Sequence, residues 1–460
     1  MNTLLLQPSD VLFFRDGRPM SGSLAGHGAA WPLPTVTNAA LHAALHRAEI
    51  ENVHAHRRGR SGSYSNDEKH RDRKFGSLVT AGPFPELENG TWLFPRPLDA
   101  GKPNCTDATY HPLSKDLCAS SLPKPLEYPV ANAEKPTKDT PAPWWNADAF
   151  AQYLTPTSGG SPAFHKDSDF SDTESTYGIG LDPTTGTQDG ERFYSAHYLR
   201  LKPTCRLGLL AEAWDKINDN GANKRDLIQA IFPNSGAKTT IIAGGQQRVC
   251  TVERPCGASL PLPRSLIDDF KIEVETEEKS LVEMFLVKWV LLTPAIFPRI
   301  DEGISKRGTQ RKAHPGGWLP TWVCPSNGDV LLQTINEDER KRRRKLNAEG
   351  KGYESNPNIS AKLVAALTGK PIPVTGYALV PDPDRAAGPK STHLAVPAGS
   401  VYYFQCDGKK AAEKLAAALN WHGQGDFTTI RNRRSTLFGE KGFGLGICGT
   451  WHPHKGNRPS

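Results

Sequence analysis

The residues whose types and spacing favour a chemical role lie near the end of the chain, where positions 439–449 read GEKGFGLGICG. The glycines of this run allow positive φ angles and a close approach of the backbone to another molecule. Backbone N–H groups, one lysine and one phenyl ring together suit a phosphate chain with unstacked bases. The run therefore predicts nucleic-acid binding, and a glycine-rich turn without a ligand is the alternative. Its predicted contacts are Lys441, Gly442, Phe443, Gly444 and Gly446.

The spacing of Gly444, Gly446 and Gly449 also matches a dinucleotide-binding loop. Such a loop opens a helix and is followed by an acidic residue about twenty positions later. Only eleven residues follow Gly449, and the Trp451-His452-Pro453 sequence is unsuited to a helix. We therefore expect no nicotinamide or flavin cofactor, and no other cofactor.

Further groups of residues share this cationic or glycine-rich character. Two arginines frame a turn after the first predicted strand, where they either clamp phosphates or pair with Asp10 and Asp16. A pair of glycines precedes another arginine in the middle of the chain, and three arginines precede the final glycine run. The additional predicted contacts are Arg15, Arg18, Gly244, Gly245, Arg248, Arg431, Arg433 and Arg434. For Phe443, a place in the hydrophobic core is the alternative to stacking on a base.

Two histidine-containing segments deserve separate treatment. His27 lies in a glycine-spaced loop and is predicted to contact RNA, with general-base catalysis as a weaker alternative because the sequence identifies no partner acid. Cys448, His452 and His454 form a cluster without an evident fourth ligand. We therefore predict no metal site there.

The composition limits the classes of protein to consider. The 460 residues carry a net charge of +7, so binding to an anion depends on where the basic side chains cluster. The 8 cysteines form no CxxC pair, which is typical of free thiols in a reducing cytoplasm. A secretory signal is not evident, and no apolar run approaches the about 20 residues of a membrane span. These features predict a cytoplasmic protein that does not contact a membrane.

The elements that would position these residues alternate between strands and helices. Apolar and β-branched runs predict strands, and amphipathic segments predict helices at 35–49, 222–232, 359–367 and 409–419. The order strand, helix, strands, helix, glycine-rich loop, strand occurs twice. We therefore predict an α+β fold with two ferredoxin-like (RRM-like, βαββαβ) domains and long irregular insertions. The predicted domains are 1–262, with a basic insertion near 54–76, and 263–460, with the glycine-rich loop 439–449 and a basic insertion at 336–356.

Six blocks of sequence, in order along the chain, resemble a known family. They are LLLQPSDVLFFRDGRPM at 4–20, AGPFPELENGTWLFPRPLD at 81–99, YGIGLDPTTGTQDGERFY at 177–194, LLTPAIF at 291–297, PAGSVYYF at 397–404 and GEKGFGLG at 439–446. Together they are similar to the third subunit of the Cmr complex, the type III-B CRISPR effector, which belongs to the RAMP superfamily. One departure is Ala39-Ala40-Leu41-His42, where RAMP proteins often carry a Gly-Ala-Leu-Arg-like helix start.

The resemblance implies a specific place in an RNA-guided antiviral complex. It implies binding to the 5′ repeat-derived tag of the crRNA, contact with the large polymerase-like subunit and with a backbone RAMP subunit, and only indirect contact with target RNA. It also implies no catalysis by this subunit. Because related RAMP proteins include ribonucleases, the alternative function is a metal-independent endoribonuclease with His27 as its base. A protein–protein scaffold whose glycine loops only pack is a further alternative.

Overall fold

The computed structural model describes residues 1–14, 24–26, 31–48, 78–113, 121–134, 138–216, 224–233, 239–257, 259–275, 280–304, 310–333, 357–378 and 388–454. The predicted contacts Arg15, Arg18 and His27 lie outside the described residues, as do the basic insertions 54–76 and 336–356. Within the described part, the fold is mixed α/β and rich in strands.

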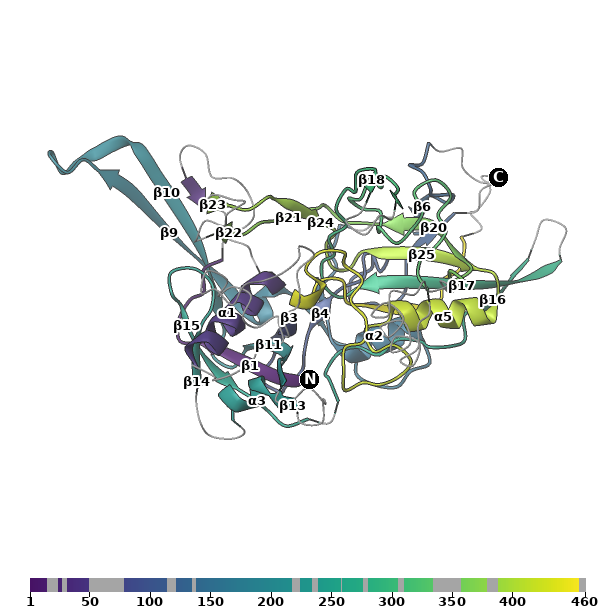
Figure 1. Ribbon diagram of the computed structural model, residues 1–460, viewed down its shortest axis with the longest axis horizontal. Coiled ribbons are helices and arrows are strands. Elements are labelled where there is room, and N and C mark those ends of the chain that lie inside the picture. The colour runs from purple at the N-terminus through teal and green to yellow at the C-terminus, as the bar shows by residue number, and fades with distance from the viewer. Residues whose placement is uncertain are drawn as a thin grey trace.

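An antiparallel sheet in the order β14-β15-β1-β11-β3 forms the centre of the N-terminal half (Figure 1). Its strands are β1 (Asn2–Pro8), β3 (Val79–Glu86), β11 (Arg206–Glu212), β14 (Thr239–Ile242) and β15 (Val249–Glu253). Helices α1 (Pro34–Arg47) and α3 (Leu227–Ile231) cover one face. The run of leucines in β1 is continuous because both faces are covered. Leu4 and Leu6 pack with the helices, whereas Leu5 packs in a core on the opposite face.

A second antiparallel sheet forms the C-terminal half, in the order β16-β17-β25-β20, with β26 also paired to β17. Its strands are β16 (Lys271–Glu275), β17 (Leu281–Leu291), β20 (Ala361–Leu367), β25 (Val401–Cys406) and β26 (Gly446–Gly449). Helix α5 (Lys409–Leu419) covers one face, where Leu415 and Leu419 pack with Trp289, Tyr402 and Phe404. Both sheets therefore have one face covered by helices.

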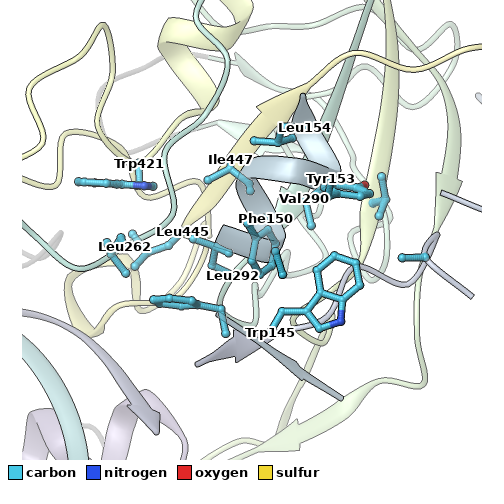
Figure 2. Close-up of a cluster of buried hydrophobic side chains, with 14 of the residues drawn as sticks. Trp145, Phe150, Tyr153, Leu154, Leu262, Val290, Leu292, Trp421, Leu445 and Ile447 are labelled. Carbon is cyan, nitrogen blue, oxygen red and sulfur yellow. The ribbon is translucent and has the colours of Figure 1, made fainter. Parts of the chain in front are cut away.

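The uncovered faces of the two sheets meet in one shared core. Leu5 and Phe84 from the first sheet belong to the same buried cluster as Val290 and Tyr403 from the second. Helix α2 (Ala147–Leu154), whose first turn is capped by Asn146, contributes further aromatic side chains to this cluster. Figure 2 shows Phe150 among Leu292, Leu445 and Val290. The two halves therefore bury their apolar surfaces against each other.

A buried polar cluster lies inside this shared core. The Asp99 carboxylate accepts hydrogen bonds of 2.8 Å from the Tyr153 hydroxyl, and the Lys288 ammonium lies 3.5 Å from Asp99 Oδ2. The same ammonium lies 3.7 Å from the centre of the Tyr153 ring. Burial lowers the pKa of Lys288, while the neighbouring Asp99 opposes that shift. Because removing one member of a buried ion pair costs about 3–5 kcal/mol, this cluster ties the segment around Asp99 to the second sheet.

A long two-stranded ribbon extends from the N-terminal half (Figure 1). It consists of β9 (Ser171–Leu181) and β10 (Gln188–Leu201), and the short strand β2 (Leu24–Gly26) pairs parallel with β10. Most of β9 is exposed, whereas the last residues of β10 return to the core of the half. The base of the ribbon is therefore fixed to the body of the protein.

The other elements are short and join the loops in pairs. They are β4 (Phe94–Pro95), β7 (Trp144–Trp145) and β8 (Phe164–His165); β5 (Tyr110–Pro112) and β6 (Val130–Asn132); β12 (Trp214–Lys216) and β13 (Lys224–Asp226); β18 (Gly303–Ile304) and β19 (Gln310–Arg311); β21 (Ile372–Val374) and β24 (His393–Ala395); β22 (Tyr377–Ala378) and β23 (Gly388–Pro389); and the 3₁₀ turns η3 (Asp167–Asp169) and η4 (Gly439–Lys441). No helix in the described part of the chain is both long enough and apolar enough to cross a bilayer.

One predicted helix is wrong and another is too long. The segment 359–367 forms strand β20, because pairing with β25 and burial of Leu363 and Val364 on opposite faces outweigh the helical preference of its Ala, Leu and Lys residues. The helix predicted at 222–232 is reduced to α3, since β13 occupies the residues just before it. The predictions for α1 and α5 are confirmed.

Candidate nucleic-acid interface

The loop between β14 and β15 forms a turn at residues 244–247, here called the first glycine turn. The backbone N–H of Gly245 donates a 2.8 Å hydrogen bond to the carbonyl of Phe13. Gly244 has a φ of 78°, and a Cβ at this position would lie 2.6 Å from the same carbonyl oxygen. Glycine is therefore needed here because the turn lies directly against the backbone of its own chain.

The next two residues of the turn are strained. Gln246 and Gln247 have φ angles of 56° and 52°, in the left-handed region that residues with a Cβ seldom adopt. Each such residue costs about 1–2 kcal/mol. Both side chains are exposed. Backbone strain that exposes polar side chains is frequent at binding sites, so the first glycine turn is a candidate contact region.

Arg248 follows the turn and lies beside an aromatic ring of the ribbon. Its guanidinium lies 5.4 Å from the centre of the Tyr198 ring and donates a 3.0 Å hydrogen bond to Gln246 Oε1. The amide of Gln246 in turn donates to the Tyr198 hydroxyl at 3.2 Å and is the main cause of a lowered pKa of this phenol. The Phe13 and Tyr198 rings are 5.4 Å apart. Backbone hydrogen bonds between Leu12 and Leu199 fix this arrangement.

Carboxylates balance the arginines of this region. Arg200 pairs with Asp10 at 3.1 Å and with Glu174 at 2.7 Å, and Arg248 lies 3.5 Å from Asp10. These ion pairs are largely exposed, and such pairs contribute about 0–1 kcal/mol. A phosphate group can therefore replace a carboxylate at low cost. We call the set Asp10, Phe13, Tyr198, Arg200, Gln246 and Arg248 the arginine–aromatic cluster.

The sequence analysis did not single out Phe13, Tyr198 or Arg200. Tyr198 and Arg200 are two positions apart on β10, so they lie on one face of the strand. This alternation is the signal that could have identified them. Their proximity to Gly244 and Gly245 depends on chain segments that are far apart in sequence.

The second glycine turn, residues 442–446, lies inside the protein. All its residues are buried. A Cβ on Gly442 would lie 2.7 Å from Cα of Ala81, one on Gly444 would lie 2.1 Å from the Ser435 nitrogen, and one on Gly446 would lie 2.2 Å from Trp289 Nε1. These glycines therefore permit contacts within the chain, which favours the alternative of a turn without a ligand.

Phe443 is fully buried and packs with Ile296, Val374 and Ala395. Its ring consequently has no face available for a base, and the predicted alternative of a core position fits it. Lys441 is half-buried, with its ammonium 4.5 Å from the centre of the Phe438 ring. Burial lowers the pKa of Lys441, and Glu440 opposes this shift.

The arginines ahead of the second glycine turn point in different directions. Arg431 is exposed and pairs with Asp426 at 2.6 Å. The guanidinium of Arg433 donates to the carbonyl of Ile430 at 3.3 Å. Arg434 donates to the carbonyl of Ala418 and so caps the C-terminal end of α5, where a cation is favourable. The three arginines therefore do not form one continuous positive surface.

The described residues bring the predicted contacts together at the first glycine turn only. Gly244, Gly245 and Arg248 join the arginine–aromatic cluster, whereas the residues of the second glycine turn are packing residues between the halves. Among the described side chains, no group of three or more histidines, cysteines and acids is arranged to hold a metal ion.

Comparison with known proteins gives one strong match. The family model described as "CRISPR-associated protein (Cas_Cmr3)" matches residues 4–451. No curated protein matches the sequence. Two solved structures match with low identity. One is the "Cryo-EM structure of the Type III-B Cmr-beta bound to cognate target RNA", with 14% identity, 87% of this chain and 86% of that chain covered, and a TM-score of 0.35. The other is the same complex bound to cognate target RNA and AMPPnP, with 15% identity, the same coverage and a TM-score of 0.33.

Proposed function

Because this chain belongs to the Cas_Cmr3 family of CRISPR-associated proteins, the third subunits of the type III-B Cmr effector, we propose that it is a non-catalytic, RNA-binding subunit of that complex. In this proposal it holds the 5′ repeat-derived tag of the crRNA and connects the large polymerase-like subunit to the backbone RAMP subunits. It contacts target RNA only through the complex, which acts in the prokaryotic cytoplasm. The observation that carries the proposal is the position of Arg248 and Tyr198 beside the strained, exposed first glycine turn.

Both sheets, we propose, are ferredoxin-like. The strands β1, β3, β11 and β15 follow one another in the chain and lie in the spatial order β15-β1-β11-β3. The strands β17, β20, β25 and β26 lie in the order β26-β17-β25-β20. Both are the fourth-first-third-second order of an antiparallel βαββαβ unit. The first unit has α1 and α3, and the second has α5 before its last strand. This correspondence supports domains at 1–262 and 263–460.

The arginine–aromatic cluster suits a single-stranded RNA tag. Sequence-selective RNA binding generally uses unstacked strands, whose bases stack on aromatic rings and whose phosphates meet arginines. The half-buried rings of Phe13 and Tyr198 and the guanidinium groups of Arg200 and Arg248 supply both functions. The backbone at Gly244 and Gly245 adds a concave edge. We propose Lys441 and Arg431 as peripheral phosphate contacts, and we retain Arg15, Arg18 and His27 as predicted contacts outside the described residues.

The test uses the complete particle purified with its crRNA. We expect Tyr198→Ala/Arg248→Ala to expose the 5′ tag to a 5′-to-3′ exonuclease and to weaken guide retention as salt rises. Removing one arginine–phosphate contact should reduce the slope of log affinity against log salt by about 0.7 for single-stranded RNA. The control is Arg299→Ala, which removes an exposed arginine that pairs with Asp301 at 3.0 Å. Tag protection and salt slope equal to those of Arg299→Ala would contradict the assignment.

The non-catalytic part of the proposal has its own test. Purified protein is incubated with CRISPR repeat RNA in EDTA, which leaves metal-independent cleavage intact. We expect no sequence-specific cutting. Cutting that is lost in His27→Ala would establish the endoribonuclease alternative.

A further inference from the structure

The hairpin formed by β16 and β17 extends from the second sheet at the end of the protein opposite the β9–β10 ribbon (Figure 1). In its register, Lys271 faces Phe285, Glu273 faces Glu283 and Glu275 faces Leu281. The intervening pairs are Ile272 with Met284 and Val274 with Val282. Because directly opposed residues share one face, each face of the hairpin has its own chemical character.

One face carries an apolar strip that runs from the shared core into solvent. Ile272 is buried at 5% exposure, Met284 and Val274 are half-buried, and Val282 is 45% exposed. On the other face, at the outer end, Leu281 is 67% exposed. A strip of side chains that begins in the core and continues uncovered is characteristic of an interaction surface.

The rim of this strip is acidic. Glu273 and Glu283 face each other across the strands, and Lys271 lies 2.5 Å from Glu283 and 3.7 Å from Glu273. Asp268 and Asp269, just before β16, are also exposed. These four carboxylates and one ammonium leave a local net charge of −3. Directly opposed like charges destabilise a hairpin, and a cationic partner would remove that cost.

We propose that the β16–β17 hairpin docks onto a neighbouring protein subunit that presents an apolar patch bordered by lysine or arginine. This inference rests on the proposed function in that the neighbour is a subunit of the same effector complex. The negative charge disfavours RNA, whose phosphates it repels, so a protein is the occupant that fits. The hairpin thus assigns protein contact to one end of the molecule, and the arginine–aromatic cluster assigns RNA contact to the other half.

The test compares assembly of variants in the co-expressed complex. Val282→Ser removes exposed apolar surface, and Glu273→Lys/Glu283→Lys reverses the charge of the rim. The matched controls are Leu394→Ser and Asp301→Lys, since Leu394 is an apolar side chain of β24 with 57% exposure and Asp301 is an exposed acid outside the hairpin. We expect each hairpin variant to weaken incorporation into the particle at least tenfold in a titration followed by size exclusion, and the controls to assemble as the wild type does.

A second measurement guards against a misfolded hairpin. Hydrogen exchange of the β16 and β17 amides is compared between the isolated chain and the particle, and thermal unfolding verifies that each variant folds. We expect these amides to be protected on assembly in the wild type. Equal protection in both states, or normal incorporation of the folded variants, would overturn the proposal.

Other occupants give different results, and each would also overturn it. Concentration-dependent dimerisation of the isolated chain that the hairpin variants abolish would identify a second copy as the partner. Weaker binding of crRNA by the isolated hairpin variants would identify RNA. Because Tyr198→Ala/Arg248→Ala tests tag binding with the hairpin intact, failure of the docking proposal and failure of the proposed function are distinguishable.

Discussion

The two glycine turns use the same residue type in opposite environments. In the first glycine turn, Gly244 and its glutamine neighbours are exposed beside Arg248 and Tyr198. In the second, residues 442–446 are buried against β3, Ser435 and Trp289. Glycine provides a close approach in both turns, but the second approach is to the protein itself. Glycine density therefore indicates close packing and does not by itself indicate a ligand.

The sharpest contrast concerns Phe443, which the comparison assigns to folding. Phe443→Ala should lower the free energy of unfolding by about 3–5 kcal/mol, because it leaves a cavity among Ile296, Val374 and Ala395. Urea unfolding measures this change. Lys441→Ala is the control within the same turn and should cost only about 0.5–1 kcal/mol, the contribution of an accessible cation–π contact. The comparison breaks if Phe443→Ala is as stable as the wild type yet loses guide RNA.

The glycines of the second turn give the next largest effect. Gly444→Ala should destabilise the protein by about 2–4 kcal/mol, because its Cβ would overlap the Ser435 nitrogen and its φ is 77°. Gly439→Ala is the matched control, since its Cβ would lie 3.4 Å from the Arg433 side chain at an ordinary φ. Thermal unfolding of both variants separates the two cases. Equal stability would mean that the turn has room to adapt and is not a packing device.

The segment that leads to the second turn also predicts a pH dependence. His422 is fully buried, its Nε2 accepts a 3.2 Å hydrogen bond from the Ser265 N–H, and burial lowers its pKa from 6.5 to about 4. Between these pH values the unfolded chain binds the proton and the folded protein does not, so stability falls as pH decreases. The full effect is at most about 3 kcal/mol. Unfolding midpoints between pH 7 and pH 4 should fall in the wild type and change less in His422→Gln, and parallel curves would exclude this histidine as the cause.

The first turn should respond in binding rather than in folding. Tyr198→Ala should weaken binding of single-stranded tag RNA by about 1–3 kcal/mol, the contribution of base–aromatic stacking. Tyr198→Phe keeps the ring and should bind nearly as the wild type does. Fluorescence anisotropy with labelled RNA measures both variants. Equal loss in both would assign the effect to the hydroxyl that contacts Gln246 instead of the ring.

The smallest expected effect concerns backbone strain. Gln247→Gly relieves a left-handed residue with a φ of 52° but increases the entropy of the unfolded chain. These terms oppose each other, so stability should stay the same or rise by up to about 1 kcal/mol while RNA affinity falls. Urea unfolding and anisotropy on the same preparation measure the two quantities. A clear loss of stability would show that the side chain of Gln247 supports the fold.

Local patterns predict the regular elements better than the site. The helix at 409–419 is predicted correctly because its Ala- and Leu-rich run is amphipathic and begins just after a glycine. The same residue types at 359–367 mislead, because pairing with β25 decides the conformation there. Glycine spacing locates both turns, but the atoms that they approach, in Phe13, Ser435 and Trp289, are distant in sequence or invisible to a local pattern. Tyr198 and Arg200 have only a two-residue alternation as a signal, which is common to exposed strands.

The shared core has a consequence for how the protein forms on the ribosome. Leu5 and Phe84 are synthesised early, yet they are covered by residues such as Val290, Leu445 and Ile447 that emerge last. Gly442 then closes against Ala81 of β3. Pairings of such long sequence separation form slowly, and the apolar surface awaiting them is prone to aggregation. The nascent chain therefore exposes one face of its first sheet until translation is nearly complete, so expression of residues 1–262 alone should require a chaperone or a fused cover for that face.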